Sequence, residues 1–177
     1  QAKIYRSGEE KVTLGQELSY VEYYLYLQSY RFGERLSYEI AVSEEKLKEQ
    51  YIPKLCIQLI VENAVVHGLE PKVDNGFVKV SVYRQEGCIC IDTVDDGVGF
   101  GADGEVALPL EKREKDSAHN HVGLGNVHHM IQLMYGEAYG VTVFSSPGRG
   151  STVRIRIPED QGEPEKSEEE WQKKESG

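Results

Sequence analysis

The sequence predicts an α+β fold, a two-layer α/β sandwich in which helices cover one face of a mixed, mostly antiparallel sheet. Helical periodicity and strand-like alternation follow one another along the chain, and two pairs of expected strands are joined by tight hairpins. A length of 177 residues with 39% hydrophobic content is enough for one core. We therefore expect one domain with appendages.

The first elements are a long helix and a strand. Leucine, valine and phenylalanine recur at helical spacing over residues 13–32, which predicts a tyrosine-rich amphipathic helix. Thr13 is a plausible N-cap, supported by Glu17 four residues on. Residues 36–42 alternate in the manner of a half-buried strand.

A second helix and a hairpin follow. Pro53 suits the first position of a helix over residues 53–67, and Gly68 is expected to end it. Residues 77–85 and 88–94 alternate, and the Glu-Gly pair between them predicts a tight hairpin.

The last third of the chain is expected to hold a loop, a helix and a second hairpin. Residues 101–122 are polar and irregular, and a loop of that length in a compact domain favours a lid or binding loop. Residues 123–135 predict a helix, and residues 141–158 predict a hairpin turning at 147–150.

Charge and cysteine content exclude several classes. A net charge of -10 and a pI near 5.0 argue against nucleic acid as the main partner, which would need clustered cations. Residues 159–177 contain eight acidic and three basic side chains and predict a mostly disordered tail. No apolar run is long enough for a bilayer and no signal peptide opens the chain, so the fragment is expected to be soluble. Cys56, Cys88 and Cys90 fit no zinc spacing and are expected to be reduced.

The second helix combines an apolar surface with four polar side chains. These are Gln58, Glu62, Asn63 and His67. Buried polar groups need partners, and an internal network would explain each residue alone. Four of them on two neighbouring stripes favour a functional site.

The stretch IDTVDDGVGFGADG, residues 91–104, ends an apolar strand in two aspartates followed by closely spaced glycines. A partly buried Asp95 carboxylate accepts hydrogen bonds only and therefore calls for a donor such as an exocyclic amine. Gly97 and Gly99 let the chain turn while leaving an open wall. A solvated Asp-Asp-Gly turn remains an equally good explanation of this stretch alone.

Three glycine patterns need to be separated. No helix follows the G-x-G-x-x-G match at Gly99, and no P-loop motif occurs, so both of these nucleotide-binding classes are excluded. Gly123 and Gly125 stand where a helix begins, and free amides at that end bind phosphate. Gly148 and Gly150 are explained equally well as hairpin glycines or as ligand contacts.

Metal binding by histidine is poorly supported. His128 and His129 are adjacent on a helix and face different directions, and no carboxylate sits at a supporting spacing.

Four segments in a fixed order carry a resemblance to a known family. ENAVVHG, DDGVGFG, GLGN and GRGSTVRI together closely resemble the ATP-binding domain of sensor histidine kinases, a Bergerat-type fold shared with gyrase B, the Hsp90 chaperones and MutL. YLYLQSYRFGERL together with VENAVVHG looks most like the bacterial integral-membrane kinases of the YesM and LytS types. The resemblance covers about residues 14–158.

The resemblance implies a role for each matching residue. Asn63 would bind Mg²⁺, His67 would lie beside the phosphates, and Glu62 would assist proton removal. Asp95 would accept a hydrogen bond from the adenine amine. The remaining implied contacts to ATP are Gly97 and Gly99 at the base, Gly123, Leu124, Gly125 and Asn126 under the lid at 101–122, and Gly148, Gly150 and Thr152 at the far wall of the base pocket.

The implied function is transfer of the ATP γ-phosphate to a histidine on a dimerisation domain. Residues 1–35 resemble the end of that dimerisation region, residues 36–158 the ATP-binding catalytic domain, and 159–177 the acidic tail. None of the five histidines has the setting of a phosphoacceptor, so the fragment is not expected to phosphorylate itself. A response regulator and a second copy are the implied partners, and the longer protein is expected to anchor this cytoplasmic domain to the bacterial plasma membrane.

Two positions depart from the family pattern. Val66 and Met130 stand where relatives tend to carry basic residues, so phosphate charge would be less well compensated. The alternatives are therefore a serine kinase of the anti-sigma type, an ATPase, or a nucleotide-binding module that has lost catalysis.

Overall fold

The computed structural model describes residues 11–100, 103–108 and 122–159. Within them the main sheet has the strand order β2-β4-β5-β8-β7-β6. Its strands are β2 (Leu36–Val42), β4 (Gly76–Gln85), β5 (Cys88–Asp95), β6 (Gly104–Val106), β7 (Gly140–Ser146) and β8 (Gly150–Pro158). β2 pairs with β4 in parallel and the other neighbours pair antiparallel, which confirms the mixed, mostly antiparallel sheet.

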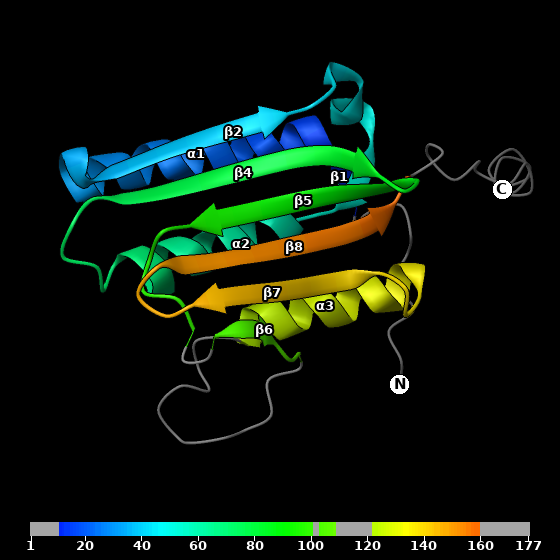
Figure 1. Ribbon diagram of the computed structural model, residues 1–177. Coiled ribbons are helices and arrows are strands. Elements are labelled where there is room, and N and C mark those ends of the chain that lie inside the picture. Colours follow the sequence, from blue (N-terminus) through cyan, green and yellow to red (C-terminus); the bar gives the residue numbers. More distant parts are fainter. Residues whose placement is uncertain (1–10, 101–102, 109–121, 160–177) are drawn as a thin grey trace, which may run out of the picture.

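The helices lie on one face of this sheet, as Figure 1 shows. They are α1 (Leu14–Phe32), α2 (Cys56–Asn63) and α3 (Val122–Tyr135). Shorter elements connect them: η1 (Gly33–Arg35), η2 (Glu45–Glu49), the π-helical η3 (Ala64–Leu69), and a small antiparallel pair of β1 (Lys11–Thr13) with β3 (Tyr51–Pro53). The predicted two-layer sandwich is therefore confirmed.

Alternation along the central strands builds the core between the two layers. In β5 and β8 the odd-numbered side chains face the helices, and Ile89, Ile91, Ile155 and Ile157 are at most 1% exposed. Burying each such side chain contributes about 1.5–3 kcal/mol. The same periodicity turns Asp95, at the end of β5, toward the helix-covered face.

The start of α1 confirms one expectation and corrects another. Thr13 is the N-cap, but the residue that completes the capping box is Gln16, whose side chain accepts from the Thr13 N–H. The prediction that Glu17 supports this cap is wrong. Since the helix begins at Leu14, Glu17 lies one position too far along, and its side chain is buried against α2.

Both ends of the second helix differ from the prediction. Pro53 ends β3, and α2 begins at Cys56 after Leu55, whose φ is 68°. Gly68 does not end the helix, because the chain continues from Asn63 into η3, where the Glu70 N–H donates to the Val65 carbonyl at 2.9 Å in a π-type bond.

The second helix is apolar nearly all round, but the expectation that it is therefore buried on every side is wrong. The side chains of Leu55, Leu59 and Val66 are 42%, 40% and 38% exposed. They lie on the side of the helix that faces away from the sheet.

The two hairpins are confirmed. The first turns at Glu86 and Gly87, which both have positive φ (51° and 74°), as in the turns that match strand twist. The second joins β7 to β8 through the turn before Gly150. Cys56, Cys88 and Cys90 are buried and carry free thiols.

Part of the expected loop at 101–122 proves to be a strand. β6 pairs with the end of β7, from Gly104 opposite Ser145 to Val106 opposite Val143. Residues 101–102 and 109–121 of the proposed lid, and 160–177 of the proposed tail, lie outside the described residues. Among the described helices, none has the length and apolar character needed to span a membrane.

Candidate functional site

Segments distant in sequence meet at one end of the sheet. Figure 1 shows the end of β5, the beginning of β8, the C-terminal end of α2 with η3, and the beginning of α3 at that end. All four motifs singled out from the sequence therefore belong to one region.

Asp95 is the buried carboxylate of this region. It lies opposite Ser151 in the β5–β8 register and is 4% exposed. Its Oδ2 accepts from the Ser151 hydroxyl at 2.7 Å and its Oδ1 from the Gly97 N–H at 2.9 Å. Burial raises the pKa of Asp95, although these two hydrogen bonds oppose the rise. Within the described residues no salt bridge includes Asp95. Ionising this buried carboxylate therefore costs free energy, which is typical of carboxylates at functional sites.

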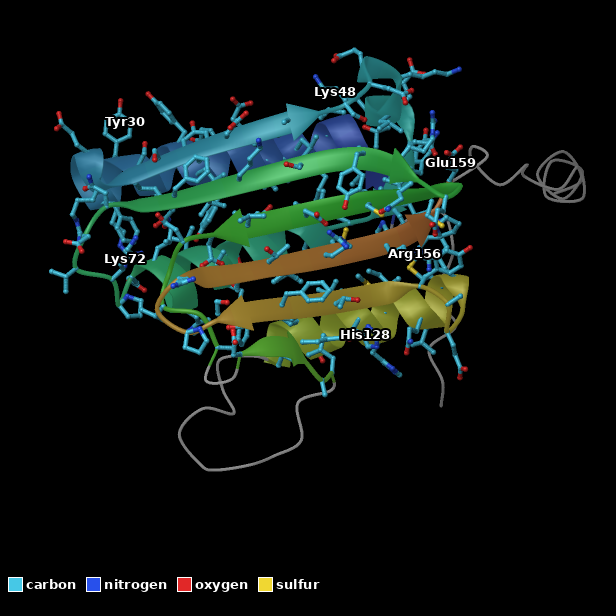
Figure 2. The ribbon with its side chains drawn as sticks, in the orientation of Figure 1. Tyr30, Lys48, Lys72, His128, Arg156 and Glu159 are labelled. Atoms are coloured by element: carbon cyan, nitrogen blue, oxygen red, sulfur yellow. The ribbon has the colours of Figure 1, made fainter. Side chains whose placement is uncertain are left out.

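The neighbouring Asp96 has a structural role. Its Oδ1 accepts from the Phe77 N–H at 2.7 Å, and its Oδ2 lies 3.2 Å from the Lys72 ammonium. Figure 2 shows Lys72 at this same end of the sheet. Asp96 thus fixes the turn after β5 to the start of β4, which leaves Asp95 pointing inward.

The closely spaced glycines are needed by the protein's own backbone. A Cβ on Gly97 would overlap the Gly68 carbonyl, to which the Val98 N–H donates at 2.9 Å. A Cβ on Gly99, whose φ is +74°, would lie 2.9 Å from the Ser146 carbonyl oxygen, and one on Gly150 would overlap the Asp95 carbonyl. The backbone therefore passes close to η3 and to the second hairpin, and these contacts hold Asp95 at its position.

Gly97→Ala is expected to destabilise the domain by about 1–3 kcal/mol, because the new methyl group pushes the turn away from η3. Urea unfolding of both forms measures the difference. The matched control is Gly125→Ala, where a Cβ meets no atom of the described residues within 4 Å and the helix gains up to about 1 kcal/mol. Equal stability of wild type and Gly97→Ala would contradict the close approach.

The polar residues of the second helix extend along it, from Gln58 in its first turn to Asn63 and His67 at the end where Gly68 lies against Asp95. Gln58, Glu62, Asn63 and His67 are all half-buried. The Gln58 amide nitrogen donates to Glu62 Oε1 at 3.2 Å, so the two share a stripe as expected. Asn63 is the last α-helical residue and His67 lies in the π-turn, a geometry found frequently at functional sites.

The first turn of α3 is open where a ligand would approach. A Cβ on Gly123 or Gly125 would meet no atom of the described residues within 4 Å. Leu124 between them is 1% exposed and anchors the turn to the core, whereas Asn126 is exposed. Backbone N–H groups in a first helical turn have no partner within the helix and bind anions.

His128 ties α3 to β7 instead of forming part of the site. Its Nδ1 accepts from the Val141 N–H at 2.9 Å, and its ring lies against Gly140, where no Cβ would fit. Burial lowers the pKa of His128, which keeps this acceptor neutral. Figure 2 shows the residue on α3 below β7.

A cavity of about 370 Å³ opens at the same end of the sheet. It is lined by Val94, Asp95, Asp103, Gly104, Phe144, Ser145, Ser146, Arg149, Gly150, Ser151 and Thr152. The side chains of Val94, Phe144 and Thr152 belong to the face without helices, whereas the Asp95 carboxylate faces the helices. The cavity is therefore not the space in front of the carboxylate.

Sequence reasoning named Thr152 and missed Ser151. The structure brings Ser151 to Asp95 and turns Thr152 to the opposite face of β8. The alternation of Val153, Ile155 and Ile157 would have revealed this, because Ser151 shares their face. Gly148 lies in the hairpin turn, and its N–H donates to the Val98 carbonyl at 2.9 Å.

The fold and the site define the class of protein. The chain belongs to the family of histidine kinase-, DNA gyrase B- and HSP90-like ATPases, whose model matches residues 52–161. The resemblance drawn from the four motifs is thereby confirmed, and ATP is the ligand that this family implies.

The individual relatives are sensor histidine kinases. The chain is 33% identical over 147 residues to the sensor histidine kinase YesM of Bacillus subtilis (strain 168) and 36% identical over 150 residues to YpdA of Escherichia coli (strain K12). These matches cover 83% and 85% of the chain but only 24% and 25% of the relatives, so the chain spans about a quarter of their length.

Solved structures agree with the fold. The catalytic domain of histidine kinase ThkA matches with a TM-score of 0.57 at 11% identity, over 84% of this chain and 95% of that one. ThkA in complex with the response regulator protein TrrA matches with a TM-score of 0.54 at 12% identity, over 85% and 41% of the two chains. At this identity the likeness concerns the fold alone.

Proposed function

We propose that this domain holds ATP and Mg²⁺ at the described end of the sheet and transfers the γ-phosphate to a histidine on a dimerisation domain. The observation that carries the proposal is Asp95, a buried carboxylate without a cationic partner among the described residues, at the sheet end where Asn63 and the open first turn of α3 also lie.

Asp95 would recognise the base. A carboxylate has about four acceptor positions, and the Ser151 hydroxyl and the Gly97 N–H use one on each oxygen. These two donors fix the plane of the carboxylate, and a remaining lone pair would accept from the adenine amine. Gly97 and Gly99 would form the wall of the base pocket, with Gly148 and Gly150 in the neighbouring hairpin.

The first turn of α3 would hold the phosphates. Gly123 and Gly125 leave space for oxygen atoms to approach the backbone N–H groups, Leu124 anchors the turn, and Asn126 adds a polar side chain. His67, on η3, would approach the phosphates from the other side.

The residues present fit a magnesium ion. Asn63 supplies an amide oxygen, a hard ligand of the kind Mg²⁺ accepts alongside phosphate oxygens and water. When bound, the ion would neutralise charge on the phosphates during transfer.

Glu62 would accept the proton from the attacking imidazole. The Gln58 amide orients its carboxylate through the 3.2 Å hydrogen bond to Oε1. The phosphorus–oxygen bond to ADP then breaks as the phosphorus–nitrogen bond forms, and catalysis rests mainly on positioning and charge neutralisation.

The phosphoacceptor and the partners would belong to the longer protein. We propose that α1 continues dimerisation helices which carry the histidine, so that residues 1–35 and 36–158 serve different roles in a homodimer. We further propose that the longer protein is anchored in the membrane, and the ThkA–TrrA complex supports a response regulator as the next acceptor.

The test is to supply the histidine separately. The chain is mixed with Mg²⁺, radiolabelled ATP and a polypeptide made from the segment that precedes it in the longer protein. We expect acid-labile phosphate on that polypeptide and none on the chain alone. The matched control is the same polypeptide with its histidine replaced by alanine.

Two other results would each select a rival. Acid-stable phosphate would indicate a serine kinase of the anti-sigma type. Tight ATP binding without transfer would indicate a module that has lost catalysis. Val66, next to His67 and 38% exposed, favours this rival because its side chain brings no charge to the phosphates.

A further inference from the structure

Glu17 is a buried carboxylate that serves a different helix from its own. It lies in α1, is 0% exposed, and accepts at Oε2 from the Leu55 N–H and at Oε1 from the Gln58 N–H, both at 3.2 Å. These two donors belong to the first turn of α2, where backbone N–H groups have no partner within the helix and the helix dipole is positive.

The second helix depends on this contact for its N-terminal cap. Its N-cap residue is Leu55, in the left-handed conformation, and no side-chain hydrogen bond of Leu55 caps the helix. Burial raises the pKa of Glu17, while the amides of α2 and the charge of Lys54 oppose the rise. The Glu17 carboxylate, which lies 38 residues before Leu55 in the sequence, thus caps the start of α2.

Two hydrogen bonds that share Gln58 connect this cap to Glu62. The Gln58 backbone N–H is bound to Glu17, and the Gln58 side chain donates to Glu62 Oε1 at 3.2 Å. Asn63 is the next residue after Glu62. A shift of Gln58 along the helix axis would therefore move the two side chains to which proton transfer and Mg²⁺ binding are assigned.

The same face of α1 places Tyr24 within the electrostatic influence of Glu62. Tyr24 follows Glu17 by two helical turns and is half-buried. The pKa of Tyr24 is raised to about 12, first by burial and then by the negative charge of Glu62. Farther along, Arg31 forms an ion pair with Glu70, just after η3. The first helix is thus bound to the start of α2 through Glu17 and to the residue just after η3 through Arg31.

We infer that Glu17 is a positioning residue that couples the placement of α1 to the geometry of Glu62 and Asn63. This inference rests on the proposed function for its consequence, since a displacement of α1 would then alter the binding of the Mg²⁺–ATP complex. Coupling is reciprocal, so ATP bound at the site also stabilises the contact between α1 and α2.

The test compares Glu17→Gln with Glu22→Gln in the complete 177-residue chain. Glu22 is exposed on the same helix and provides the matched control. A glutamine at position 17 keeps one oxygen to accept from one backbone N–H. Its NH₂ group is a donor and cannot accept from the other. We expect ATP affinity in Mg²⁺, measured by titration calorimetry, to fall about tenfold for Glu17→Gln and to stay unchanged for Glu22→Gln.

Hydrogen exchange of the protein without nucleotide decides the inference independently of ATP. We expect exchange in Glu17→Gln to rise from the first turn of α2 through Asn63. Faster exchange confined to the first turn would show a local cap and overturn the coupling, as would wild-type exchange throughout. If Glu17→Gln fails to fold, Glu17→Asp, which is one methylene too short to hold both amides, is measured in the same way.

The two proposals can fail separately. A wild-type chain that does not bind ATP overturns the proposed function, whereas the exchange pattern of α2 still decides the role of Glu17. A Glu17→Gln variant that folds, shows wild-type exchange in α2 and binds ATP as tightly as wild type overturns the inference alone.

Discussion

Asp95→Asn is expected to weaken ATP binding by about ten- to a hundredfold, because a hydrogen bond to a charged acceptor contributes about 1.5–3 kcal/mol. Asparagine can keep the contacts to the Ser151 hydroxyl and the Gly97 N–H, since its oxygen accepts and its nitrogen donates. In that orientation an NH₂ group replaces Oδ2 and can no longer accept from the adenine amine, and the oxygen that remains is an uncharged acceptor. Titration calorimetry with Mg²⁺ and ATP measures the change.

The control for this variant lies on the same strand. Asp92 belongs to the opposite face of β5 and forms a bidentate pair with Arg154 at 2.8 and 2.9 Å. Asp92→Asn should cost stability without changing ATP affinity. Unchanged ATP affinity in Asp95→Asn would contradict the assignment of Asp95 to the adenine amine.

Asp95→Asn is also expected to be at least as stable as the wild type at neutral pH. Burial raises the pKa of Asp95 in the folded state above its ordinary value, so the folded protein binds its proton more readily than the unfolded chain. The wild type therefore gains stability relative to the variant as pH falls through the folded-state pKa and loses it as pH rises. Urea unfolding at several pH values measures this difference.

Asn63→Ala is expected to reduce Mg²⁺-dependent phosphoryl transfer by at least about a hundredfold while weakening ATP binding by less than about tenfold. The base and the first turn of α3 would still hold the nucleotide, but the ion would lose its protein ligand and the γ-phosphate its charge neutralisation. Transfer to the separate histidine polypeptide and calorimetry with and without Mg²⁺ give the two numbers.

The matched control for this change is Asn75→Ala, an exposed asparagine in the connection before β4. It should alter neither transfer nor affinity. If Asn63→Ala reduces ATP binding and phosphoryl transfer equally, Asn63 contacts the nucleotide directly and is not a ligand of Mg²⁺.

The sheet was predictable because its signals are local. Alternation over residues 77–85 and 88–94 and the Glu-Gly pair between them specify a hairpin without reference to any other part of the chain. The same is true of Asp95 at the end of its strand and of Gly123 and Gly125 at the start of a helix.

The second helix was mispredicted because distant contacts override local preference. Pro53 suits a first helical position, yet it pairs in β3 opposite Lys11, and the cap comes from Glu17 in another helix. Gly68 suits a helix end, yet the π-turn carries the chain past it so that its carbonyl accepts from the Val98 N–H. The partners of Pro53 and Gly68 lie far away in the sequence, and local spacing patterns do not reveal contacts at that separation.

The order of the strands has a consequence for synthesis of the protein. Among the described strands β8 is the last to leave the ribosome, but it lies in the middle of the sheet, between β5 and β7. Until β8 emerges, the nascent chain exposes the unpaired backbone N–H and C=O groups along the edge of β5 to other molecules. Asp95 also has no Ser151 hydroxyl beside it. A chain stopped before Gly150 would therefore be prone to aggregate, and premature termination would yield an insoluble product.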